Sequence, residues 1–576
     1  MLFFNDIKSN IRPGSNFLGK TQLHCTGMRP LNPSFLQLPN QFTNIRIIKS
    51  NETLMEAHMF KCLTSTFLAV AMTLTMLMAA TACNGAEDGP KGDSATELTI
   101  PVSLTSETTE ETTEPEPLPS VPSPTPGYVD PEYVRMLDDV TPDMMNCDYW
   151  IATGMAGGFD MDEPLMDADQ IASFNEENIT VFEREDGTEL FSLPGIGETV
   201  SGDDLRYLLE ANRSQVPDDP SEYYLNGAPT TRSYWDGLVA LDNLSAVEDE
   251  MPVRFAYTVK RATVRLFPTE DRVFESSSDR YFDYLLFSEC MPFMPVAVLH
   301  ESTDGNYYYV VFDSFAAWVR KDAIAFCHNR DEWETRQNPA QFLTVIEREI
   351  RLGNDPYSPA TTNLVLPMGT KMELVPVSAA PASIGQRTTY GDYVVKVPTR
   401  GSDGFIVDEY VLIPVSDDVI VGVLELTPAN ILRETFKLLG DRYGWGGDLQ
   451  ANDCTGISRE IYNTFGVKLP RTRQSLVTGI HKVDLTDLDE SSRVDAIRQL
   501  APGSLISMPG HMTIYIGMVN DRPYVISSVG TLVQPAPGST DAMHPDSVVL
   551  SSLYVRTRGL YTWLELMKTA MEFSAE

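Results

Sequence analysis

The sequence predicts an α+β fold class, in which two small β-barrels precede a mixed domain of helices and strands. The stretch 237–423 is rich in β-branched and aromatic residues interrupted by turn residues, a pattern typical of many short strands. The stretch 424–576 combines apolar residues at helical spacing after Cys454 with alternating strand residues after His511. A chain of 576 residues is long enough to bury several such cores.

The composition argues against several classes of partner. Acidic residues number 81 against 43 basic ones, which gives a net charge of -38. This charge argues against nucleic acid as a partner and against electrostatic adhesion to anionic lipid, and it suits a soluble extracytoplasmic protein. The seven cysteines are widely spaced and form no cluster with metal-ligand spacing, so we predict neither a metal site nor a cofactor. A disulfide among Cys147, Cys290 and Cys327 stays open, with free buried thiols as the favoured interpretation.

The N-terminal region contains a secretion signal at 59–82. A basic start is followed by an apolar run whose end, AATAC, places small residues directly before Cys83. This order is typical of a bacterial lipoprotein signal, so we expect the mature protein to begin at a lipidated Cys83 and to be held at the membrane of the cell envelope, facing the periplasm or the exterior. An uncleaved transmembrane anchor is the alternative, because the run is just long enough to span a bilayer.

The remaining N-terminal segments follow from this signal and from composition. Residues 1–58 are polar and without periodicity, and we interpret them as an unstructured, over-long start. Residues 83–127, rich in Thr, Glu and Pro, have too few apolar side chains to fold, which predicts a disordered tether. Residues 128–236 are assigned to a small mixed domain, 237–330 and 331–423 to the two barrels.

A candidate nucleophile lies at the start of a predicted helix. Apolar Ile457, Ile461 and Phe465 recur at helical spacing after Cys454, and Asp453 is a good N-cap. The positive end of the helix dipole and the unpaired N–H groups there favour the thiolate, so we expect a lowered pKa for the Cys454 thiol. His511, which opens a strand after the turn Pro509-Gly510, is the natural base.

The motifs around these two residues resemble the NlpC/p-sixty family of papain-like cell-wall endopeptidases. They occur in the family's order and are Tyr443-x-Trp445-Gly446-Gly447, Asp453-Cys454-Thr455-Gly456, Leu469-Pro470-Arg471 with Gln474, and Gly510-His511. The resemblance implies a papain-like domain over 424–576, with Cys454 attacking a carbonyl and His511 as base. It also implies that Tyr443, Asp453 and Thr455 contact the substrate.

The third catalytic member departs from the family pattern. Relatives carry a His, Asn or Gln on the strand after the histidine, and the matching place in this sequence is Ser527. A serine can accept a hydrogen bond from the imidazole, but it gives the imidazolium no charge stabilisation. His481 and His544 are the less favoured substitutes.

The barrels resemble bacterial SH3-like domains, with the first carried by the run 298–326. In related enzymes the first barrel supplies an acid and a tyrosine that grip the free amine of the substrate. Glu289 matches the acid, whereas Phe315 stands where the tyrosine is expected. The neighbouring tyrosines 307–309 are possible replacements.

These observations predict a cell-wall cysteine endopeptidase that acts as a monomer on peptidoglycan peptides. The bond implied by the resemblance joins γ-D-glutamate to a diamino acid. A non-catalytic peptidoglycan-binding lipoprotein is the first alternative, which the departures at Ser527 and Phe315 favour. An amide or acyl transferase acting on another amine is the second.

Overall fold

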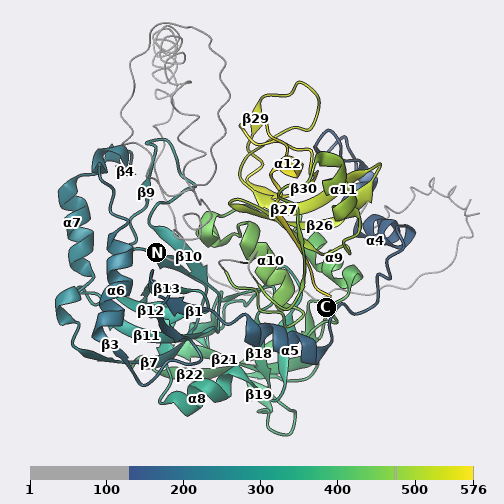
Figure 1. Cartoon of the computed structure of the whole chain (residues 1–576). Coiled ribbons are helices and arrows are strands. Elements are labelled where there is room, and N and C mark those ends of the chain that lie inside the picture. Colours follow the sequence, from purple (N-terminus) through teal and green to yellow (C-terminus); the bar gives the residue numbers. More distant parts are fainter. Residues whose placement is uncertain (1–128, 472–473, 475–476, 575–576) are drawn as a thin grey trace, which may run out of the picture. The chain divides into compact units, whose positions relative to one another are not determined.

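The computed structural model describes residues 129–471, 474 and 477–574 (Figure 1). The expected over-long start, the signal peptide, the tether and the lipidation site Cys83 all lie outside these residues. Within them, helices and antiparallel sheets are mixed, as the α+β class requires. None of the described helices is both long enough and apolar enough to cross a membrane.

The first barrel is a seven-stranded antiparallel sheet in the order β10-β8-β13-β12-β11-β7-β14. Its core includes the buried side chains of Val264, Val298, Val310 and Val319. Its strands are β7 (Arg254–Thr258), β8 (Ala262–Arg265), β10 (Leu286–Cys290), β11 (Pro295–Glu301), β12 (Tyr307–Phe312), β13 (Phe315–Arg320) and β14 (Ile324–Phe326).

The second barrel has five antiparallel strands in the order β22-β21-β18-β15-β23 and a core of its own around Leu343, Met372 and Val395. Its strands are β15 (Phe342–Val345), β18 (Lys371–Leu374), β21 (Asp392–Arg400), β22 (Ile406–Pro414) and β23 (Val419–Val421). The β-branched and aromatic runs of the sequence therefore form strands in both barrels, as expected.

The third domain packs helices against a six-stranded antiparallel sheet in the order β24-β31-β25-β26-β27-β30. Its main helices are α9 (Pro428–Lys437), α10 (Cys454–Asn463) and α11 (Glu490–Arg498). The sheet comprises β24 (His481–Asp484), β25 (Leu505–Met508), β26 (His511–Val519), β27 (Arg522–Val529), β30 (Ser547–Ser552) and β31 (Thr569–Glu572). Ile457 and Ile461 of α10 are fully buried in the same core as Ile514 of β26 and Ile526 of β27.

The region expected as one N-terminal domain divides its buried side chains between different cores. Trp150 of α4 (Cys147–Ala156) and Phe174 of α5 (Ala168–Glu177) belong to the core of the third domain. Leu205 of α6 (Gly202–Arg213) packs in the first barrel's core, and Trp235 of α7 (Arg232–Leu241) packs in a neighbouring cluster. The short helices of residues 129–236 therefore bury their apolar faces in more than one core, and a separate domain over 128–236 stays a prediction.

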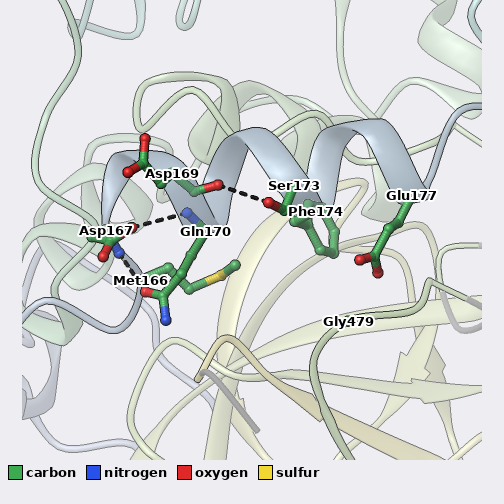
Figure 2. A pocket seen from close by; sticks show the side chains of 8 residues that line it. All are labelled: Met166, Asp167, Asp169, Gln170, Ser173, Phe174, Glu177 and Gly479. Atoms are coloured by element: carbon green, nitrogen blue, oxygen red, sulfur yellow. Dashed lines mark hydrogen bonds between the residues drawn. The ribbon is translucent and has the colours of Figure 1, made fainter.

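Helix α5 also borders a hollow of about 310 Å³, shown in Figure 2. Asp167 and Gln170 form a reciprocal capping box at its first turn, and Glu177 lies at its far end near Gly479. None of the nucleophile or base candidates lines this hollow.

The remaining α-helices and strands are short. They are α8 (Arg330–Gln337), α12 (Trp563–Leu566), β1 (Val181–Glu183), β2 (Glu189–Ser192), β3 (Thr199–Ser201), β4 (Tyr224–Leu225), β5 (Ala228–Pro229), β6 (Glu250–Pro252), β9 (Val273–Phe274), β16 (Glu349–Arg351), β17 (Val365–Pro367), β19 (Ser383–Ile384), β20 (Arg387–Thr388), β28 (Leu532–Val533) and β29 (Ala542–Met543).

Candidate active site

Cys454 is the first residue of α10, as the apolar spacing predicts. The Asp453 side chain caps the helix by accepting a hydrogen bond from the Gly456 N–H at 2.8 Å. The helix ends at Asn463, and Gly466 follows in the left-handed conformation with a φ of 82°. The Cys454 thiol is therefore half-buried at the positive end of the helix dipole, where its own N–H has no intrahelical acceptor.

His511 is the first residue of β26, directly after the tight turn at Gly510. Its Nε2 lies 3.1 Å from the Oγ of Ser527, which is fully buried on the neighbouring strand β27. The structure thus brings the expected third member to the histidine. His481 pairs instead with Glu572, and His544 contacts Thr531, so the described contacts of these two histidines lie elsewhere.

Helix α10 packs against β26, and the sulfur of Cys454 lies next to the start of that strand. The backbone N–H of Met512, the residue after His511, hydrogen-bonds to the Cys454 sulfur. Because Nε2 of His511 faces Ser527, Nδ1 is the ring nitrogen left to take a proton. Trp563 packs edge-on against the imidazole, with the ring centres 4.7 Å apart, and limits its rotation.

The expectation of a lowered thiol pKa is wrong for this structure. Burial, followed by the charge of Asp453, raises the pKa of Cys454 to about 12, although the N–H groups of Met512 and Thr455 act in the opposite direction. Burial lowers the pKa of His511 to about 4, against the charge of Asp453. Both groups are therefore neutral at pH 7, and attack by sulfur requires the proton to pass to His511 in the same step.

Asp453 is occupied by contacts within the protein. The two terminal nitrogens of Arg471 contact its two carboxylate oxygens at 2.6 and 2.5 Å, and the Gly446 N–H donates to it at 3.1 Å. Thr455 donates its hydroxyl to the same carboxylate at 3.1 Å. Although burial opposes it, Arg471 lowers the pKa of Asp453 below its ordinary value. The capping role of Asp453 is thus confirmed, and substrate contact by Asp453 and Thr455 stays a prediction.

Tyr443 lies beside the nucleophile. Its side chain is 8% exposed, and burial, followed by the charges of Asp453 and Cys454, raises its pKa well above the ordinary value. The phenol therefore stays protonated and keeps a hydrogen to donate. Phe282, from the first barrel's stretch before β10, lies with its ring centre 6.3 Å from that of Tyr443. The barrel thus borders this side of the site.

Glu289 of β10 lies against the catalytic loop but is already paired. Its side chain is 3% exposed, and its carboxylate contacts Arg261 Nε at 2.5 Å. The carboxylate also lies so close to Gly447 that any side chain at position 447 would collide with it. Gly447 also has a φ of 89°, which favours glycine. Arg261 in turn donates to the Gln450 and Ala451 carbonyls. A grip of Glu289 on a substrate amine stays a prediction, and it requires displacement of Arg261.

Two of the three tyrosines proposed as replacements, Tyr307 and Tyr309, have hydroxyls that are already bonded. Phe315 packs against Phe287, with ring centres 4.7 Å apart. The Tyr307 hydroxyl donates to Glu270 at 2.7 Å, and the Tyr309 hydroxyl donates to the Ala316 carbonyl at 3.0 Å. Both hydroxyls are therefore engaged inside the barrel.

Arg261 and Arg471 are site residues to which the sequence alone gave no role. Arg471 stands in the Leu-Pro-Arg motif, and a basic residue after a helix in so acidic a chain was the available signal for an ion pair. Arg261 carries no local signal. All four described cysteines are free, so the interpretation of Cys147, Cys290 and Cys327 as free thiols is confirmed. Among the described residues, no group of three or more His, Cys, Asp or Glu side chains is placed to hold a metal ion.

Comparisons with known proteins agree with this architecture. Residues 272–320 match the SH3 domain family (SH3b1 type), and residues 440–543 match the NlpC/P60 family. A solved NlpC/P60 endopeptidase from Photobacterium damselae subsp. piscicida is 16% identical, covers 77% of this chain and 99% of its own, and superposes with a TM-score of 0.57. NlpC2 from Trichomonas vaginalis is 15% identical over 53% of this chain and 98% of its own, with a TM-score of 0.19.

No curated protein matches the chain significantly. The family matches and the Photobacterium structure confirm the expected fold class, in which an SH3-like domain precedes a papain-like NlpC-type domain.

Proposed function

We propose that this protein is a cysteine endopeptidase that hydrolyses peptidoglycan stem peptides at the bond between γ-D-glutamate and a diamino acid. Two contacts inside the segment that matches the NlpC/P60 family support the proposal: His511 contacts Ser527, and the Cys454 sulfur contacts the backbone of Met512, the residue after His511. The SH3 match at 272–320 supports a wall peptide as substrate.

The geometry supports a general-base mechanism. Sulfur of Cys454 attacks the scissile carbonyl while His511 Nδ1 takes the thiol proton, which forms a C–S bond and an imidazolium. The proposal assigns the Cys454 N–H at the helix start and the Tyr443 hydroxyl, which stays protonated, as donors to the developing oxyanion. The imidazolium then protonates the leaving amine as the C–N bond breaks, and water, deprotonated by His511, hydrolyses the thioester.

Membrane anchoring through Cys83 is the second part of the proposal and rests on the AATAC sequence. Cys83→Ala should move the full chain from the detergent phase to the aqueous phase and abolish lipid labelling. Retention of Cys83→Ala in the detergent phase would instead support a membrane-spanning anchor.

A non-catalytic peptidoglycan-binding role is the main rival, because the Cys454 thiol is neutral and Glu289 is paired with Arg261. Mass spectrometry of defined stem peptides incubated with wild-type protein and with Cys454→Ala separates the two. Products formed by the wild type alone support hydrolysis, whereas intact peptide that co-purifies equally with both supports binding. Adding a primary amine to the same reaction tests the acyl-transfer alternative, which predicts an amide product heavier than the hydrolysis product by the mass of the amine minus one water.

A further inference from the structure

The first barrel contacts the residue that holds both neighbours of the nucleophile. Arg471 is buried, and its guanidinium forms the bidentate pair with Asp453 and also donates to the Thr455 hydroxyl. Asp453 and Thr455 immediately precede and follow Cys454. One side chain therefore fixes the chain on both sides of the reacting sulfur.

Two serines of the first barrel hold this arginine from its other side. The Arg471 Nε donates to the hydroxyl of Ser288 on β10 at 3.1 Å. The Arg471 backbone N–H donates to the hydroxyl of Ser314 at 3.0 Å, in the two-residue turn between β12 and β13. Both serines are buried. The backbone and the side chain of Arg471 are thus each bonded to the barrel.

Neighbouring contacts keep this part of the barrel in place. Asp313, beside Ser314 in the same turn, forms an ion pair with Arg459 of α10. Arg459 Nε also donates to the Leu469 carbonyl at 3.0 Å, just before Arg471. The turn therefore contacts both the nucleophile helix and the segment that carries the arginine.

Stability alone is a weak reason for this arrangement. A buried ion pair contributes little net stability compared with apolar residues of similar size, because both charges lose their water. An arginine can also donate up to five hydrogen bonds in a fixed plane, which suits it to hold several groups in one geometry. The contacts of Arg471 are thus better explained by its position next to Cys454 than by a contribution to stability.

We propose that Arg471 is a positioning residue for the attack of Cys454, and that the first barrel takes part in catalysis by fixing Arg471 through Ser288 and Ser314. The inference rests on the proposed function for its peptide assay, but its second readout, the alkylation of Cys454 by iodoacetamide, needs no substrate.

The test replaces the two serines and leaves the arginine in place. Ser288→Ala combined with Ser314→Ala should lower kcat roughly ten-fold, because small displacements of reacting groups cost rate steeply, and should slow Cys454 alkylation at about pH 10 by a similar factor. The matched control is Ser302→Ala, a buried serine of the same barrel whose hydroxyl bonds to Asp304 within the barrel. Ser302→Ala should keep the wild-type kcat and the wild-type alkylation rate of Cys454, even if this variant unfolds at a lower temperature.

Combining variants tests whether the serine acts through the arginine. Arg471→Lys keeps the charge but removes the Nε–H that reaches Ser288. Ser288→Ala should then cause less than a two-fold further loss in the Arg471→Lys background, although it lowers the rate in the wild type. A full additional loss in that background would overturn the inference.

The outcomes separate this inference from the proposed function. If no stem peptide is cut, the proposed function fails, and the alkylation rates still decide the role of Arg471. If the double serine variant alkylates and turns over like the wild type, the inference is wrong even for an active peptidase. Equal losses in Ser302→Ala would also overturn it, because they would trace the effect to barrel stability.

Discussion

Lowering the pH should inactivate the enzyme at an unusually acidic midpoint, because His511 must be neutral to act as base. Burial lowers its pKa from 6.5 to about 4. The acidic limb of kcat/KM should therefore have its midpoint near pH 4. Titration with a fluorescent stem peptide between pH 3 and 8 measures this limb. A midpoint near pH 6.5 would refute the reasoning, because it would mean that the imidazole is not desolvated in the free enzyme.

The same shift makes folding stability depend on pH, with a defined sign. The unfolded chain binds a proton at His511 below pH 6.5, whereas the folded chain does not do so until about pH 4. The stability that His511 contributes is therefore complete above pH 6.5 and is lost as the pH falls towards 4. The shift corresponds to at most about 3 kcal/mol, because the ring keeps some contact with solvent. Urea unfolding at pH 4 and pH 7 measures the free energy of unfolding of the wild type and of His511→Gln. The difference between the two proteins should narrow or reverse at pH 4, and the same difference at both pH values would contradict the pKa shift.

Three further perturbations follow from the site. The rate at which iodoacetamide alkylates Cys454 should rise only well above pH 9, because burial raises the pKa of the thiol to about 12. If the midpoint of the rate against pH lay below pH 8, the sequence-based expectation of a lowered thiol pKa would be correct instead. Ser527→Ala removes the 3.1 Å contact with His511 and should lower kcat roughly five-fold, as expected for one neutral hydrogen bond, while unchanged turnover in the folded variant would remove Ser527 from the mechanism. Burial raises the pKa of Glu460 to about 8, so ionising its carboxyl destabilises the fold increasingly as the pH rises from about 4.5 to 8. Glu460→Gln should therefore raise the free energy of unfolding by about a few kcal/mol at pH 9 and by little at pH 5. Equal effects of the variant at both pH values in urea unfolding would contradict this.

The parts of the site that the sequence predicted are those set by local rules. The helix at Cys454, its cap at Asp453 and the strand at His511 depend on spacing and turn residues within a few positions. Ser527 followed from the resemblance, which puts the third member on the strand after His511, and that strand pairs with β26 in antiparallel register.

The parts that the sequence missed depend on segments distant along the chain. The thiol pKa rises because other elements bury Cys454, and burial cannot be read from a helix start alone. The bond between Ser314 and Arg471 joins two domains, and Glu289 pairs with Arg261 on a distant part of the same barrel, so no local sequence pattern predicts either contact. Trp150 and Leu205 likewise belong to different cores although they stand in one expected domain.

Asp453 offers a physical reason why a serine suffices beside His511. A charged or strongly dipolar orienter is needed where the imidazolium has no other stabilising charge nearby. Here the carboxylate of Asp453 favours the protonated form of His511 and is itself kept ionised by Arg471. In the proposed mechanism, the negative charge of Asp453 therefore stabilises the positive charge that forms on the imidazole when the proton leaves Cys454, and Ser527 accepts one hydrogen bond. If the first barrel positions Arg471 as we propose, it contributes to the electrostatics of this proton transfer as well as to its geometry.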